Sequence, residues 1–253
     1  MFRISLMSFL ISASSFFLPA QIQNPGNYDN GTNFNILYKS DASGKLYVNT
    51  RGYGISFRRA KHVTSNSSNF YEVDVRALKH PKEVKLTGDG PEKKRYVYGK
   101  LNNVLLAGGN IGTQKVLFTK ADSKAVEVRY SYSLGPFFAL AKPYYVRVYK
   151  SSSNKKDPTL IRFDQDGFTS DSGRVVGRAP FSKGLPDMKI YPGVNAKFNL
   201  SFEYAPYSNL IRAIETGVSI DYFPNALPIM FRNPSENIVV TINLGFVFGR
   251  KWY

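Results

Sequence analysis

The stretch NIVVTINLGFVFGRKWY, residues 237–253, closes the chain and decides the fold. Successive side chains of a β-strand point to opposite faces, so every second residue shares a face. Here one face is wholly apolar, while the other carries small or polar residues. The apolar face consists of Ile238, Val240, Ile242, Leu244, Phe246 and Phe248. This alternation predicts a final β-strand with one apolar face.

Aromatic residues gather towards the end of this strand, at Phe246, Phe248, Trp252 and Tyr253. A final strand of this kind resembles the C-terminal strand of bacterial outer-membrane β-barrels, whose apolar face meets lipid and whose aromatic residues lie at the membrane interface. The last strand of a soluble β-sandwich fits the same stretch. The rest of the chain has to distinguish the two.

Composition narrows the classes of protein. The chain has 253 residues, of which 15% are aromatic, and it has no cysteine, which excludes disulfides and thiolate metal sites. Beyond the N-terminus no apolar run approaches the roughly 20 residues of a membrane helix. A membrane location therefore requires a closed barrel, because only helices and barrels satisfy their backbone groups in lipid. The net charge of +16 suits nucleic acid or anionic lipid headgroups.

The N-terminus carries the pattern of a secretory signal peptide over residues 1–20. Arg3 supplies an early positive charge, an apolar centre runs from Ile4 to Phe17, and the small residue Ala20 precedes the expected cleavage site. Export argues against nucleic acid as a partner. Residues 21–45 are rich in Asn, Gly and Asp and are expected to form a flexible leader.

From residue 46 to residue 253 the chain alternates between strands and polar loops, which predicts eight strands. Gly135 and Pro136 predict a tight turn between the fourth and fifth strands, and Pro143 predicts a bulge in the fifth. The longest stretch without strand pattern, residues 150–189, is expected on the opposite side of the barrel from the basic turn 79–95. The predicted strands are 46–59, 70–78, 95–110, 125–134, 137–149, 190–204, 210–223 and 237–253.

Charged residues recur on one face of several predicted strands. An eight-stranded barrel has an interior that side chains just fill, so these charges predict an interlocking network in the lumen. A soluble lipocalin-like barrel would have its apolar face inside, and alternation alone does not say which face is outward. The signal peptide and the aromatic terminus favour the membrane form. The network is Glu72, Asp74, Arg76, Glu127, Arg129, Lys197, Glu203, Glu215 and Asp221.

Strand number, loop asymmetry and terminal aromatics together resemble the small OmpA/OmpX-type outer-membrane β-barrels of Gram-negative bacteria. The resemblance covers residues 46–253 and is architectural. It implies an all-β fold, a single transmembrane antiparallel up-and-down barrel of eight strands. It also implies a cleaved signal peptide, long extracellular loops and a place in the outer membrane.

Some barrels of this size are lipid A-modifying enzymes that use a His with a Ser and an acid. The only histidines, His62 and His80, are expected on opposite membrane sides, so we expect no enzyme. Lipid A modification and a narrow passive channel remain the alternatives. An acidic loop resembles a calcium site but lacks its closing Glu, so no metal or cofactor is predicted. Its carboxylates are Asp164, Asp166 and Asp171.

Because neither catalysis nor transport is expected, the exposed loops and turns are the remaining candidates for a function. The basic turn, with Lys93, Lys94 and Arg95, is expected to contact lipid headgroups or an acidic partner. The expected partners are outer-membrane lipid, lipopolysaccharide and other envelope proteins. The sequence thus suggests an accessory or scaffolding subunit of an envelope assembly or secretion complex.

Overall fold

The structure is a computed structural model that describes residues 39–64, 66–89, 93–119, 126–149, 158–163, 175–204, 209–231 and 235–252. The expected signal peptide, most of the leader, the acidic loop with Asp164, Asp166 and Asp171, and Tyr253 lie outside the described residues. Within the described part, no helix has the length and apolarity needed to cross a membrane.

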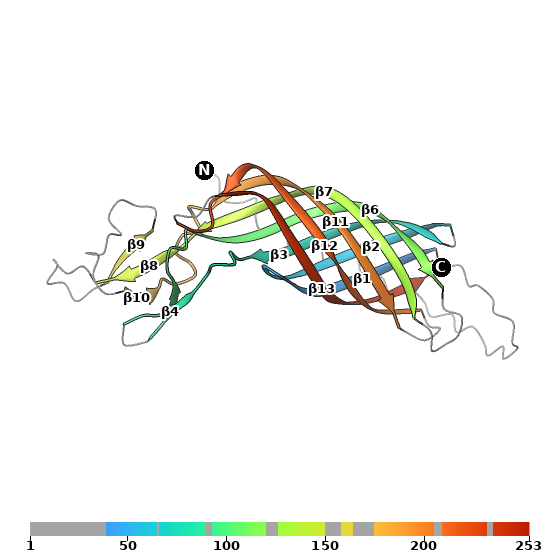
Figure 1. The fold of residues 1–253 in the computed structure, drawn as a ribbon, viewed down its shortest axis with the longest axis horizontal. Helices are drawn as coiled ribbons and strands as arrows, with labels where there is room; N and C mark the ends of the chain where they lie inside the picture. The colour runs from blue at the N-terminus through green and yellow to red at the C-terminus, as the bar shows by residue number, and fades with distance from the viewer. Residues whose placement is uncertain are drawn as a thin grey trace, which may run out of the picture. The chain divides into compact units, whose positions relative to one another are not determined.

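Eight long antiparallel strands close into a barrel (Figure 1). Each strand pairs with the next barrel strand along the chain, and the last pairs with the first, Phe246 opposite Leu46. Closure pairs every strand edge, as lipid requires. The strands are β1 (Ser40–Asn49), β2 (Gly52–Thr64), β3 (Ser67–Leu78), β6 (Asn102–Phe118), β7 (Glu127–Pro143), β11 (Lys189–Glu203), β12 (Leu210–Leu227) and β13 (Glu236–Trp252).

The apolar face of the final strand is outside. Along β13, Ile238 is 60% exposed and Phe248 52%, whereas the alternate residues Val239 and Thr241 are buried in the lumen. An apolar exterior around a polar interior is the membrane arrangement, and the lipocalin-like inverse is excluded. The expectation of an all-β, outer-membrane type of barrel is confirmed.

The strand count is right, but two strand boundaries are wrong and compensate each other. The predicted strand 46–59 is two strands, β1 and β2, joined by a turn at Thr50 and Arg51. Because β1 begins at Ser40, residues 40–45 belong to the barrel and not to the leader. Conversely, the predicted fourth and fifth strands are largely the single strand β7.

The predicted turn at Gly135 and Pro136 is wrong, because both residues lie inside β7. Pairing between β6 and β7 is interrupted opposite them, between Gly108 and Ile111. Pro136 lacks an N–H group, so it fits where a ladder bond is missing. Gly135 fits because a Cβ there would come within 2.0 Å of the Gly109 carbonyl oxygen. Pro143 ends β7 and does not form the expected bulge.

These boundaries move three predicted loops, 60–69, 79–94 and 111–124, to the opposite side of the membrane. The two longest connections, 79–101 and 144–188, share one rim with the turn 50–51 and the connection 228–235, whereas the connections 65–66, 119–126 and 204–209 share the other rim with Lys39 and Trp252. Outer-membrane barrels have short periplasmic turns and longer extracellular loops, which makes the first rim extracellular. The basic turn 79–95 is therefore on the same side as the stretch 150–189, and the predicted opposite placement is wrong.

Five short strands lie beyond the extracellular rim. The sequence predicted loops at three of them and wrongly assigned residues 95–97 and 145–148 to strands of the barrel. We call these five strands the rim module: β4 (Lys85–Thr87) with β5 (Arg95–Val97), and β8 (Tyr145–Val148) between β9 (Thr159–Arg162) and β10 (Val175–Arg178). The Asp89 backbone N–H donates to the Val175 carbonyl at 2.8 Å and joins the two sheets. Tyr144, Val146, Val148 and Phe163 form an apolar core of the module.

Candidate functional site

The centre of the lumen is organised around Arg58. Its guanidinium donates to Glu72, with Nη2–Oε2 at 2.7 Å, and to Glu215, with Nη1–Oε2 at 3.0 Å. Lys45 donates to Glu215 and Lys197 to Glu72, each at 2.8 Å. All five side chains are at most 9% exposed. The network is thus satisfied by charge-assisted hydrogen bonds, the condition under which buried charges are tolerated.

A second group lies nearer the extracellular rim. Arg76 pairs with Asp221 and lies 3.7 Å from Asp74, which also faces Lys197 at 3.3 Å. Tyr47 donates its hydroxyl hydrogen to Asp74 at 2.6 Å. This group continues the central one through Lys197, so the charges form one connected structure.

The third group lies towards the periplasmic rim. Arg129 pairs with Glu127 and, at 3.1 Å, with Glu203, which also accepts from Lys251 at 2.7 Å. The structure therefore brings all nine sequence-predicted lumen residues inside the barrel and into ion pairs.

Sequence reasoning missed three cations of the network, namely Lys45, Arg58 and Lys251. Across the three groups they bring the balance to six carboxylates and six cations. The alternation of the strand could have revealed Arg58, because Arg58 lies on the same inward face as Ser56, whereas Phe57 lies on the outward face. Lys45 was missed because it was assigned to the leader.

An apolar plug fills the lumen at its extracellular end, which the polar alternation did not predict. Phe137 and Phe223 pack edge to face with ring centroids 5.0 Å apart. The connection after β12 folds inward over them and buries Ile229 and Met230. The Leu101 N–H donates to the Ile229 carbonyl at 2.9 Å and holds this connection in place.

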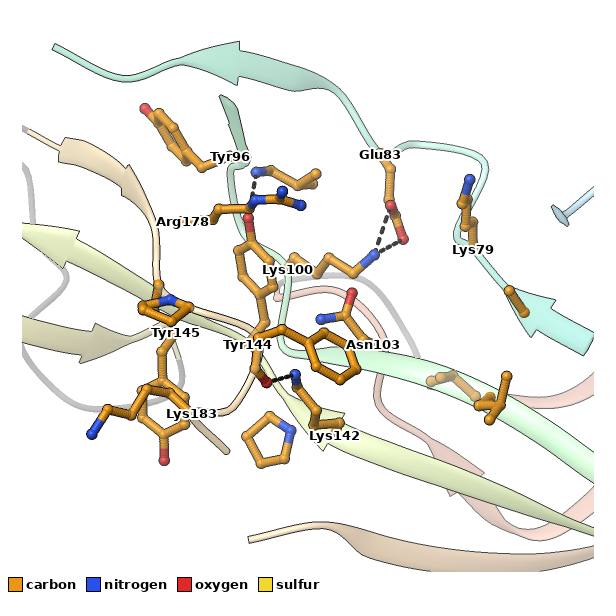
Figure 2. A pocket seen from close by; sticks show the side chains of 18 of the residues that line it. Lys79, Glu83, Tyr96, Lys100, Asn103, Lys142, Tyr144, Tyr145, Arg178 and Lys183 are labelled. Carbon is orange, nitrogen blue, oxygen red and sulfur yellow. Dashed lines mark hydrogen bonds and ion pairs between the residues drawn. The ribbon is translucent and has the colours of Figure 1, made fainter. Parts of the chain in front are cut away.

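A groove of about 1110 Å³ lies at the extracellular rim, between the ends of the barrel strands and the rim module (Figure 2). Glu83 is its one carboxylate among the described residues, and both Glu83 oxygens accept from Lys100 at 2.8 Å. The cationic side chains that line it are Lys79, Lys85, Lys94, Arg95, Lys100, Lys142, Arg178 and Lys183.

The basic-turn residues predicted to meet headgroups or a partner are divided by the structure. Lys94 and Arg95 line the groove, whereas Lys93 does not. Lys93 has a left-handed backbone with φ of 44°, at the point where the chain enters β5. All three lie on the same, extracellular side as the stretch 150–189 and not, as predicted, on the opposite side.

The two histidines lie at opposite rims, as the sequence predicted, but their sides are the reverse of the predicted ones, because the loops after the first and second predicted strands change sides. His62 lies near the periplasmic rim, with its Nε2 3.2 Å from Asp41 Oδ2 and with Ser68 opposite it on β3. Within the described part of the chain, no hydrogen bond joins His62 to a serine hydroxyl.

His80 lies at the extracellular rim, 3.6 Å from Glu236. Burial is the main cause that lowers the pKa of His80 below its ordinary value of 6.5. Among the described residues, no cluster of three or more His, Asp or Glu side chains is placed to hold a metal ion.

A closed eight-stranded barrel with an apolar exterior, a charge-paired lumen and long loops on one side defines an outer-membrane β-barrel of the small Gram-negative type. No family model and no curated protein matches the sequence.

Solved structures with a similar fold include Neisserial surface protein A (9% identity; 84% of this chain and 96% of the other covered; TM-score 0.41). They also include the N-terminal β-barrel domain of Pseudomonas aeruginosa OprF (10%; 84% and 99%; 0.40). A third is Ail, the attachment invasion locus protein of Yersinia pestis, in complex with the heparin analogue sucrose octasulfate (6%; 84% and 96%; 0.39).

Proposed function

We propose that the protein is a non-enzymatic scaffolding subunit of the outer membrane, which presents the rim module to a partner protein at the cell surface. The observation that carries the proposal is a folded module with its own apolar core, held on a barrel that offers no evident route for turnover or transport. The barrel serves as a rigid base. The basic turn 79–95 lies on the same rim and contributes β4 and the start of β5 to the rim module.

The positions of the histidines support a protein without enzymatic activity. An outer-leaflet lipid A-modifying enzyme would need its base near the extracellular rim. His62 lies at the other rim, and His80 contacts Glu236 with no serine hydroxyl bonded to it among the described residues. Among the described residues, neither histidine is hydrogen-bonded to a hydroxyl nucleophile, an arrangement that covalent catalysis requires.

The filled lumen argues against the passive channel. A solute would have to displace both the apolar plug around Phe223 and the ion pairs around Arg58. Planar-bilayer recording of the refolded barrel should therefore show no stable unitary conductance. Reproducible single-channel steps would restore the channel interpretation.

The open edge of the module indicates how a partner protein would bind. Strand β9 pairs with β8 on one edge, and no described strand pairs with its other edge. Leu160 on this strand is 39% exposed. An exposed strand edge accepts an added strand from a partner, with backbone hydrogen bonds for affinity.

The test is cross-linking on intact cells, followed by affinity purification of the tagged barrel and mass spectrometry. We expect a stoichiometric partner cross-linked to β9, and its recovery should fall at least tenfold in Leu160→Lys, because lysine on an edge strand blocks strand addition. Val63→Lys, at an exposed apolar position near the periplasmic rim, is the matched control. Recovery of the barrel alone, or equal recovery with Leu160→Lys, contradicts the scaffolding function.

A further inference from the structure

The groove at the extracellular rim has an apolar floor on the lipid-facing side of the barrel. Tyr53 is 60% exposed and Leu105 41%, and both lie on outward faces of their strands. Further down the same face of β2 follow Ile55 and Phe57, also exposed. The floor is therefore continuous with the surface that meets the acyl chains of the outer leaflet.

The walls of the groove are cationic. Lys79 lies over the Tyr53 ring at 5.3 Å, and Lys142 donates to the Phe181 carbonyl (Figure 2 shows Lys79 and Lys142). Within the described part of the chain, no carboxylate lies within ion-pair distance of Lys85, Arg95 or Arg178, although all three line the groove. Uncompensated cations on separate strands, turned towards one space, favour an anionic occupant.

We propose that this groove binds the phosphorylated headgroup of an outer-leaflet lipid. The acyl chains would lie against Tyr53 and Leu105, and the phosphates against Lys85, Arg95 and Arg178. The volume of about 1110 Å³ exceeds what a single phosphate ion fills and suits a phosphorylated sugar head.

The position of the groove distinguishes a lipid from a soluble anion. A site for a soluble polyanion needs only exposed cations. Here one groove is lined both by cations of the rim module and by outward-facing apolar residues of the barrel, a combination that suits the phosphate and the acyl chains of a lipid. The proposal is independent of a partner protein on β9, which lines no part of the groove.

The experiment is native mass spectrometry of the full barrel in detergent with bisphosphorylated lipid A, with lipid A stripped of its phosphates, and with inorganic pyrophosphate. We expect the triple variant Lys85→Gln, Arg95→Gln, Arg178→Gln to bind bisphosphorylated lipid A roughly 100-fold more weakly, since each cation near a membrane surface contributes about a fivefold attraction and the three contributions multiply. Dephosphorylated lipid A should bind weakly to both proteins.

The matched control is Lys61→Gln, Lys115→Gln, Arg212→Gln, three exposed cations towards the periplasmic rim, and it should bind like the parent protein. Heat-modifiable migration in electrophoresis reports that each variant is folded. Parental affinity in the groove variant, or equal losses in the control, overturns the proposal. If pyrophosphate binds as tightly as lipid A, the groove is a site for soluble anions and the lipid proposal is wrong.

Discussion

Arg58 and Glu215 are 157 positions apart in the chain and meet inside the barrel, Nη1 to Oε2 at 3.0 Å. Strands β2 and β12 are not neighbours in the sheet, so only closure brings the two side chains together. Glu215 is 1% exposed and Glu72, the other partner of Arg58, 3%. One guanidinium therefore neutralises two buried carboxylates.

Replacing Arg58 with Met should lower the free energy of unfolding by about 3–5 kcal/mol, because two carboxylates remain buried without their shared cation. Guanidinium titration of the barrel in lipid vesicles measures the change. Arg59→Met is the control, since Arg59 points outward, 6.0 Å from the Trp252 ring, and its loss should cost less than about 1 kcal/mol. Equal losses in the two variants would show that the ion pairs do not hold the lumen together.

Gly54 makes room for Tyr47. A Cβ at Gly54 would lie 2.6 Å from the Tyr47 Cζ and 2.7 Å from the Arg76 Cβ. Gly54→Ala should therefore destabilise the barrel by about 1–3 kcal/mol, because Tyr47 must move and weaken its bond to Asp74. In Gly109→Ala the nearest atom would be 3.9 Å away, so the same titration should show little change. If Gly109→Ala costs as much as Gly54→Ala, close packing against Tyr47 is not the reason.

The assignment of the two rims can be tested directly, because the chain has no cysteine. On intact cells, a membrane-impermeant maleimide should label Lys85→Cys in the rim module and leave Lys115→Cys unlabelled. Both cysteines should react after the membrane is permeabilised. The reverse pattern would invert the barrel and place the groove in the periplasm.

Protonation of His80 should weaken the extracellular rim. Its Nδ1 accepts from the Lys82 N–H at 3.2 Å, a bond that only the unprotonated nitrogen makes. Glu236 and Glu83 favour the charged imidazole, but burial and the cations Arg51 and Lys82 oppose it, so the pKa of His80 lies below 6.5. The folded state then binds fewer protons than the unfolded state, and stability falls as the pH drops through 6.5 towards the lowered pKa.

The measurement is the thermal unfolding temperature between pH 7.5 and pH 5, compared between the parent protein and His80→Gln. The parent should lose more stability on acidification than the variant. An NMR titration of the His80 ring should give a midpoint below the ordinary value of 6.5. If the unfolding temperatures of the two proteins fall equally on acidification, protonation of His80 does not affect the stability of the barrel.

Much of the fold could be read from local alternation. The outward row of β13 from Ile238 to Phe248, and the inward charges Glu72 and Asp74 on β3, follow from the two-residue period of a strand. Each of these relationships holds within one strand. The predicted lumen network contained more acids than bases, which indicated that further cations had to come from other strands. Lys45 and Arg58 are two of these cations.

The sequence by itself determined that the chain is an all-β barrel, with one apolar face on the final strand and charged inward faces on several other strands. Tertiary structure alone decided which side the basic turn occupies, because that side depends on the parity of every strand before it. A glycine-proline pair inside β7 looks locally like a turn, and only its neighbours in β6 show otherwise. The apolar plug, the rim module and the groove likewise depend on contacts between distant segments, which the alternation within a single strand does not encode.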